Sequence, residues 1–332
     1  MNLIRVMPAE EEMKKISSLV ILTVLVCAFF AGCKKSKSDD ARASELIVYT
    51  YDSFCGEWGP GPLIAGKFEE KTGIKITYED CGDGVHILSK ALIEKNKPYA
   101  DVLVGLDNFI YQRAVEADVL EKFRPSNSSV IDISLVDALG GDWVLTPYDY
   151  SPFAIIYNTQ SGISAPSSLE DLTKPEYSKK LILMDPRTST PGNGFDVWVR
   201  TVYGDSYDDY MSRLAPSILT MAPGWSVGYG MFTDGEAPLV ISYVTSPAYH
   251  IEYDEGDNFV ALEFTDGHIM QVEGAGIVKG ARNADGAKKF IEFLVSEEAQ
   301  REIPLTQWMY PANKSIPLPE SYSALISPKI LN

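Results

Sequence analysis

Short apolar runs alternate with amphipathic segments along the first part of the chain, and this alternation limits the folds that the sequence can adopt. Leu46 to Thr50, Ile74 to Tyr78 and Asp101 to Leu106 are predicted strands, whereas Leu63 to Lys71 and Val85 to Lys95 have the pattern of helices. Such alternation favours βαβ units, an α/β fold and a mainly parallel sheet. Ligands of these sheets bind beyond the carboxyl ends of the strands, so the turns there are candidate binding segments.

Two apolar and aromatic segments, Pro147 to Asn158 and Thr265 to Gly276, are predicted to cross between two lobes. A second α/β set lies between them, with predicted elements at Leu181 to Met184, Gly194 to Val202, Leu239 to Ser242 and Phe259 to Phe264. After the second crossing, a strand at Ala275 to Val278 and a helix at Ala284 to Val295 follow. The predicted lobes are therefore a discontinuous lobe 1, residues 45–150 and 266–332, and a continuous lobe 2, residues 151–265. Roughly 300 residues are large for a single core and suit two lobes.

The amino-terminal end has the features of an export signal. Lys14-Lys15 precedes an apolar run from Leu19 to Phe30, which ends at the small residues of Ala31-Gly32-Cys33. The run is shorter than the ~20 residues of a membrane-spanning helix, which favours a cleaved signal over residues 1–32. Met13, just before the two lysines, is an alternative start of the chain.

Ala31-Gly32-Cys33 resembles a lipobox, so Cys33 is the predicted lipidated residue, although Phe30 stands where that motif usually has Leu. An ordinary signal peptide is the alternative. Residues 33–44 are short and polar, as expected of a flexible tether at a membrane surface.

The formal net charge of −17 lies entirely in the predicted mature chain, because the signal has as many acidic as basic residues. This acidic balance excludes nucleic acid as a partner. The three histidines, His86, His250 and His268, lack the spacing of metal ligands, so no metal site is predicted. No cofactor is predicted either.

Four cysteines occur in the chain, and Cys27 lies in the predicted signal. Cys55 and Cys81 follow predicted strands of the same lobe, so in an oxidising compartment they are a possible disulfide.

Aromatic side chains gather in turns that follow predicted strands. The segment from Ser242 to His250 carries two tyrosines around Pro247. Aromatic faces attract cations and add a large apolar contact to a bound ligand. Any single ring is as readily a core or surface residue, but the set as a whole indicates a ligand site; its members are Tyr51, Trp58, Trp225, Tyr243, Tyr249 and Trp308.

Two further segments carry polar groups at predicted helix starts. Asp83-Gly84 precedes the helix at Val85, where an acidic residue is a natural N-cap, so capping and ligand binding are both open for Asp83. Thr188-Ser189-Thr190 leads into the predicted helix around Phe195, where hydroxyls and backbone N–H groups form an anion site, with plain capping as the alternative. The segment lacks the Gly-Lys ending of a nucleotide P-loop.

These motifs resemble the periplasmic thiamine-binding proteins of bacterial ABC importers, from about Glu45 to about Leu318. The segments that carry the resemblance are Tyr51-Asp52-Ser53-Phe54, Trp58-Gly59-Pro60, Gly224-Trp225-Ser226, Pro247-Ala248-Tyr249-His250 and Trp308-Met309-Tyr310-Pro311. The resemblance implies a two-lobed type II periplasmic binding fold with a cleft between the lobes. It also implies a non-enzymatic, lipid-anchored protein on the periplasmic side that delivers thiamine or its phosphates to an ABC permease.

The resemblance assigns roles to individual residues. It implies that the rings of Tyr51, Trp58, Trp225, Tyr249 and Trp308 contact the ligand. Asp83-Gly84 would hydrogen-bond the amino-pyrimidine, and Ser189 with Tyr243, next to Thr190, would bind the phosphate of a phosphorylated ligand. A carboxylate accepts well from an exocyclic amine, and a permanently charged thiazolium suits aromatic faces.

Two alternatives stay open at this point. A thiamine-degrading enzyme of the same general fold would attack with a cysteine, and Cys81 lies two residues from Asp83. A binding protein for another cation or an iron complex would use paired tyrosines such as Tyr243 and Tyr249.

Overall fold

The computed structural model describes residues 44–253, 256 and 258–331. The predicted signal peptide, Cys33 and nearly all of the predicted tether lie outside these described residues. Over the described ranges, no helix is both long and apolar enough to span a bilayer.

The first group of elements forms the predicted parallel sheet. Strand β1 (Glu45–Thr50) pairs in parallel with β2 (Lys75–Asp80) on one side and with β3 (Val102–Asp107) on the other. Helices α4 (Pro60–Thr72) and α5 (Gly84–Ile93) form the connections, as the alternation predicts. Nearly every residue of β1 and β3 is buried, which is expected of parallel strands that are covered on both faces.

A second parallel group follows along the chain. Strand β6 (Leu181–Met184) pairs in parallel with β7 (Ile218–Ala222) and with β8 (Leu239–Tyr243). The helices of this group are α8 (Thr190–Tyr203), α9 (Tyr207–Leu214) and α10 (Trp225–Thr233). The element predicted at Phe259 to Phe264 is a shorter strand in the structure, β9, which spans Phe259–Ala261.

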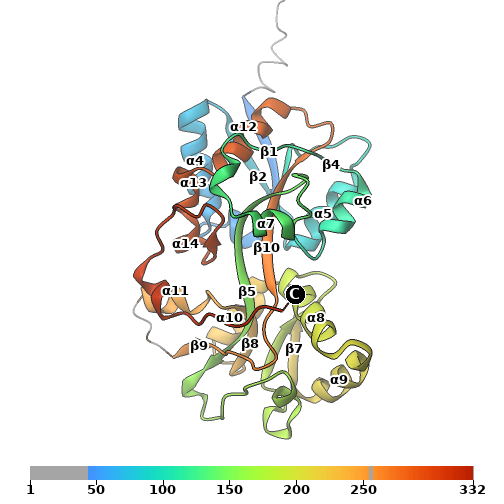
Figure 1. The fold of residues 1–332 in the computed structure, drawn as a ribbon, viewed down its shortest axis with the longest axis vertical. Helices are drawn as coiled ribbons and strands as arrows, with labels where there is room; N and C mark the ends of the chain where they lie inside the picture. Colours follow the sequence, from blue (N-terminus) through green and yellow to red (C-terminus); the bar gives the residue numbers. More distant parts are fainter. Residues whose placement is uncertain (1–43, 254–255, 257, 332) are drawn as a thin grey trace, which may run out of the picture. The chain divides into compact units, whose positions relative to one another are not determined.

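Two long strands connect these groups. β5 (Thr146–Asn158) and β10 (Met270–Val278) pair with each other antiparallel and run side by side through the middle of Figure 1. The strand order is β2-β1-β3-β10-β5-β8-β6-β7, with β4, β9 and β11 at the sides. The prediction of a mainly parallel sheet is thus wrong for the central strands. The chain leaves the first group on β5 and returns on β10, so these strands must run in opposite directions.

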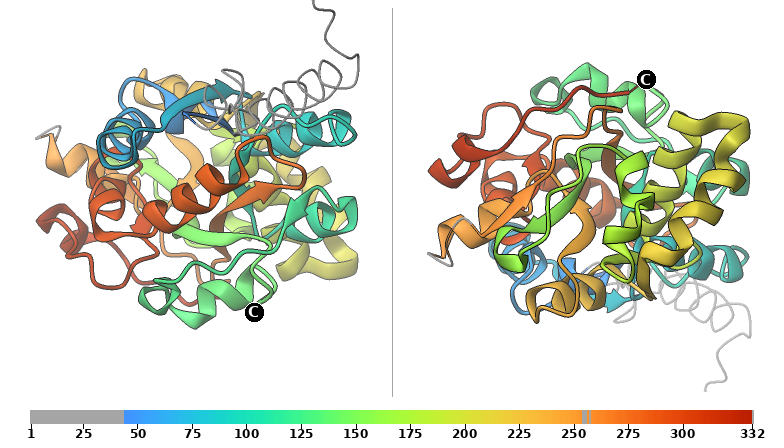
Figure 2. Two further views of the ribbon diagram at one scale, coloured as in Figure 1. Left: turned by 90° about the horizontal axis from the view of Figure 1, so that it is seen from above. Right: turned by 90° about the horizontal axis from the view of Figure 1, so that it is seen from below.

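Helices lie around the strands when the molecule is seen from above and below (Figure 2). The predicted helix at Ala284 to Val295 is α12, Ala284–Leu294. The remaining named elements are α3 (Asp52–Cys55), α6 (Tyr111–Ala117), β4 (Leu120–Glu121), α7 (Ile133–Ala138), α11 (Pro247–Glu252), α13 (Glu297–Gln300), α14 (Ile303–Thr306) and β11 (Tyr310–Pro311), with short 3₁₀ turns between them.

The buried apolar side chains form two clusters. The first core contains residues from Leu46 to Tyr148 and from Val272 to Ala312, and the second core runs from Phe153 to Ile269. The carboxyl-terminal tail differs from the predicted lobe boundaries, because Leu331 packs against the second core. Backbone hydrogen bonds hold it there: the N–H of His268 donates to the carbonyl of Lys329 and the N–H of Leu331 donates to the carbonyl of His268.

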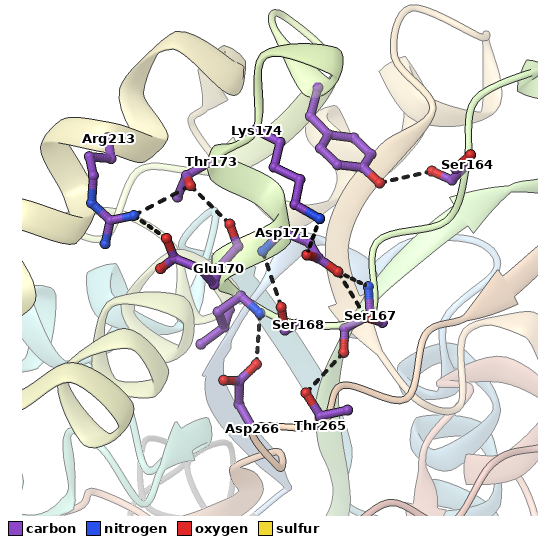
Figure 3. A network of polar contacts seen from close by, with 12 residues as sticks. Ser164, Ser167, Ser168, Glu170, Asp171, Thr173, Lys174, Arg213, Thr265 and Asp266 are labelled. Atoms are coloured by element: carbon purple, nitrogen blue, oxygen red, sulfur yellow. Dashed lines mark hydrogen bonds and ion pairs between the residues drawn. The ribbon is translucent and has the colours of Figure 1, made fainter.

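A polar network fixes the second crossing to the second core before β10 begins (Figure 3). Asp266 accepts a hydrogen bond from the backbone N–H of Leu169 at 2.7 Å, and Asp171 accepts from the N–H and hydroxyl of Ser167 at 2.9 and 2.8 Å. The N–H of Thr265 donates to the carbonyl of Ser167 at 3.0 Å. These bonds set where the chain turns toward the first core.

Gly105 allows close packing at the centre of the first core. Its φ of 101° is a conformation that other residues rarely adopt, and it lies where the register between β3 and β10 shifts. A Cβ atom on Gly105 would lie 2.3 Å from Cε1 of Tyr51. The position of the Tyr51 ring therefore depends on this glycine.

We predict that Gly105→Ala lowers the free energy of unfolding by about 2 to 4 kcal/mol, because it combines backbone strain with a clash against a buried ring. Gly66→Ala is the matched control, since its added Cβ meets nothing within 4 Å in α4. It should be neutral or stabilising by up to ~1 kcal/mol. Urea denaturation measures both, and equal stabilities would contradict the packing argument.

Candidate functional site

A cavity of about 550 Å³ lies between the two cores. Nine predicted site residues line it: Tyr51, Trp58, Asp83, Gly84, Thr190, Trp225, Tyr243, Tyr249 and Trp308. Both cores contribute, because Tyr51 belongs to the first cluster and Trp225 packs against the second. The size is typical of a small-molecule site.

Aromatic rings from both sides face this cavity. The Trp225 ring stacks on Tyr229 with ring centroids 5.0 Å apart, and its Nε1–H donates to the Ser242 hydroxyl at 2.8 Å. Tyr249 of α11 meets Trp308 edge to face at 5.3 Å, which joins the two sides at the cavity wall. Hydrogen bonding and stacking thus hold these rings in place before any ligand arrives.

Trp58 and Trp308 have unusual settings. The Trp58 side chain is 85% exposed, so it lies at the rim of the cavity and not within it. Trp308 follows α14 with φ at 58°, a left-handed conformation that is an outlier for a bulky residue. Strain of this kind persists only where the surrounding structure holds it, and it is most common at functional sites.

The Asp83 carboxylate joins the two sides of the cavity. Its Oδ1 accepts hydrogen bonds from the N–H of Gly84 at 2.7 Å and of Thr190 at 3.0 Å, and its Oδ2 accepts from the N–H of Trp225 at 3.4 Å. These three residues are the first residues of α5, α8 and α10. Helix N-termini stabilise negative charge, so one carboxylate holds three helix starts together. We call this contact the Asp83 clasp.

The clasp changes the interpretation of Asp83. Burial raises the pKa of this carboxyl, while its backbone hydrogen bonds, first that from Thr190, lower it. Asp83 is the N-cap of α5, which agrees with the capping alternative. In this conformation both carboxylate oxygens of Asp83 accept hydrogen bonds from backbone N–H groups of the protein and not from a ligand.

The neighbours of the clasp are tightly packed. A Cβ atom on Gly84 would lie 2.5 Å from the Thr190 hydroxyl, so the close approach of α8 to α5 requires glycine there. Ser189, the N-cap of α8, is fully buried beside Asp83 and is not among the lining residues. Tyr243 lines the cavity, and its hydroxyl donates to Gln271 at 2.9 Å.

The sequence interpretation missed Glu273, which lines the cavity from β10 and is 5% exposed. It accepts hydrogen bonds from the hydroxyls of Tyr51, at 2.7 Å, and Tyr148, and from Nε2 of Gln271 at 2.6 Å. The sequence does contain a signal for it, because Gln271 and Glu273 are polar residues inside the otherwise apolar run Met270–Val278.

The described lining residues include Asp52, Glu57, Asp83 and Glu273 but no lysine or arginine. With several aromatic faces in the same wall, this composition favours a positively charged ligand.

Cys55 and Cys81 are free thiols in the structure, so the disulfide considered between them is not formed there. Burial raises the pKa of each thiol to about 11. A thiol with such a pKa is a poor nucleophile at neutral pH.

Comparisons with known proteins agree with this geometry. The family described as bacterial extracellular solute-binding protein matches residues 64–327. A thiamine-binding periplasmic protein of Brucella abortus is 38% identical over 93% of this chain and 91% of its own length. The protein of the same name from Escherichia coli is 38% identical over 85% of each chain.

A solved periplasmic thiamin binding protein has a TM-score of 0.80 and 35% identity, with 86% of this chain and 90% of that chain covered. A ferric binding protein from Campylobacter jejuni, at 19% identity and a TM-score of 0.70, shares the fold alone. The predicted two-lobed type II fold is thereby confirmed. The chain belongs to the bacterial extracellular solute-binding proteins, in the group of the thiamine-binding periplasmic proteins.

Proposed function

We propose that this protein binds thiamine between its two cores and delivers it, in the periplasm, to the permease of an ABC importer. The composition of the cavity wall is the main support for this proposal. Aromatic rings from both sides and several carboxylates line the cavity, and the described lining contains no lysine or arginine. Thiamine has a flat pyrimidine that can stack and a permanent positive charge that aromatic faces attract. Thiamine as the ligand also agrees with the names of the relatives.

Closure of the site depends on contacts between the cores. The Asp83 clasp joins α5 of the first core to α8 and α10, and Tyr249 meets Trp308 across the opening. A ligand that contacts both sides would stabilise this closed arrangement over an open one. Binding and release, without bond breakage, then suffice for delivery.

Neither alternative from the sequence gains support. The family is one of solute-binding proteins and not of enzymes, and burial keeps the Cys81 thiol protonated at neutral pH. The likeness to ferric binding proteins extends to the fold alone.

The proposal includes membrane attachment through lipid on Cys33, supported by the lipobox-like Ala31-Gly32-Cys33. It extends to thiamine mono- and diphosphate, whose phosphate would accept from the N–H groups of Thr190 and Trp225 that donate to Asp83 in this structure.

We predict that thiamine at 100 times its dissociation constant stabilises the protein by roughly 2.7 kcal/mol. Trp225→Ala should remove most of this gain, because it deletes a stacked wall of the cavity. Tyr99→Ala is the control, since Tyr99 is 48% exposed and lies outside the lining. Thermal unfolding with and without thiamine measures the gain. The proposed function fails if wild-type protein gains nothing.

We predict that Asp83→Asn weakens thiamine binding about tenfold, because an amide oxygen accepts less strongly than a charged carboxylate from the N–H groups of the clasp and so destabilises the closed arrangement. The variant should also raise the affinity for thiamine diphosphate relative to thiamine, since a negative charge at the phosphate-binding N–H groups is removed. Calorimetric titration measures both ratios. The control is Asp132→Asn, whose side chain caps only its own helix α7. An unchanged ratio between the two ligands would refute the shared anion site.

A further inference from the structure

We propose that Glu273 is the residue that selects a positively charged ligand, by placing a buried carboxylate in the wall of the thiamine cavity. This inference rests on the proposed function and names a specificity-determining residue that the aromatic motifs do not reveal.

Glu273 accepts hydrogen bonds at both of its carboxylate oxygens. Its Oε2 accepts from the hydroxyls of Tyr51 and Tyr148, and its Oε1 accepts from Nε2 of Gln271 at 2.6 Å. Three donors on two oxygens stabilise an ionised carboxylate better than a protonated one. These donors therefore oppose the rise in pKa that burial causes, and above its pKa the Glu273 carboxylate places a negative charge in the cavity wall.

No cation of the described residues neutralises this charge. None of the salt bridges among the described residues includes Glu273, and the described lining contains no lysine or arginine. Burying a charge without a counter-ion costs desolvation free energy, which destabilises the free protein. A cationic ligand beside the carboxylate would offset that cost by electrostatic attraction.

Asp149, next to Glu273, differs from it in hydrogen bonding. These residues face each other across β5 and β10, and Asp149 is fully buried with no hydrogen-bond partner for either oxygen. Burial and the neighbouring Glu273 raise the pKa of Asp149 well above its ordinary value. We therefore assign the proton of this pair to Asp149 and the charge to Glu273.

Several groups surround Glu273 and set its titration. Burial raises its pKa to about 7, opposed by the hydrogen bonds from Tyr148 and Tyr51. The surrounding groups come from every element packed against it: Tyr51, Asp83, Asp107, Tyr148, Asp149, Tyr243, Gln271 and Gln307. None of these is a base that would carry a positive charge.

The experiment compares two ligands by calorimetric titration at pH 8: thiamine, and a neutral analogue in which thiophene replaces the thiazolium. Glu273→Gln should weaken thiamine binding about ten- to a hundredfold and leave the analogue within about twofold. Asp149→Asn, the matched control, should change neither affinity by more than about twofold. Glu273→Asp, which keeps the charge, should retain the preference for thiamine.

The same titration at different pH values gives an independent readout. For wild-type protein, thiamine affinity should fall as the pH drops below about 7, by up to about tenfold per pH unit, because Glu273 becomes protonated in the free protein. A carboxyl with a raised pKa supplies its charge only above that pKa. Glu273→Gln should show no such slope between pH 6 and 8.

Each outcome is decisive. Equal losses for both ligands in Glu273→Gln would make the residue structural, and an unchanged thiamine affinity would remove it from the site. A loss in Asp149→Asn as large as that in Glu273→Gln would overturn the assignment of the charge. Wild-type protein that binds neither ligand would overturn the proposed function and this inference with it, whereas the other results overturn the inference alone.

Discussion

The antiparallel pairing of β5 and β10 is the constraint on which the rest of this structure depends. Both strands take part in the first core, and β5 continues to pair with β8 in the second. The register between them shifts at Glu273 and Gly274, which leaves Tyr148 without a partner on β10. At this irregularity the Tyr148 hydroxyl donates to Glu273, which lines the cavity, while Asp149 is the register partner of Glu273 on β5. One pair of strands thus fixes both the distance between the cores and the acidic group between them.

The Asp83 clasp and Glu273 use carboxylates in different ways. Asp83 is satisfied by backbone N–H groups at three helix starts, so its charge serves contact between the cores. Glu273 receives donors from neutral side chains only, so its charge remains available to a ligand. Burial raises the pKa of both. The same residue type therefore closes the site at one position and selects its occupant at another.

The local hydrophobic pattern predicted the position of those strands and helices whose own periodicity defines a buried face. The strand at Leu181–Met184 and the helix beginning at Ala284 lie where the sequence predicts them. The prediction was weaker where partners come from far along the chain, as for the antiparallel direction of β10 and the packing of Leu331 on the second core. Pairing of that kind is decided by neighbours that no local window contains.

The sequence by itself determined the α/β class, the two crossings and the gathering of rings in turns after strands, because hydrophobic periodicity and turn residues encode these features locally. Only the tertiary structure decided what Asp83 and Glu273 do. A carboxylate acquires its role from the donors, charges and burial around it, and those surroundings come from Thr190, Trp225 and Tyr51, which lie far away in the chain. The fold, not the residue type, makes one a clasp and leaves the other facing the cavity.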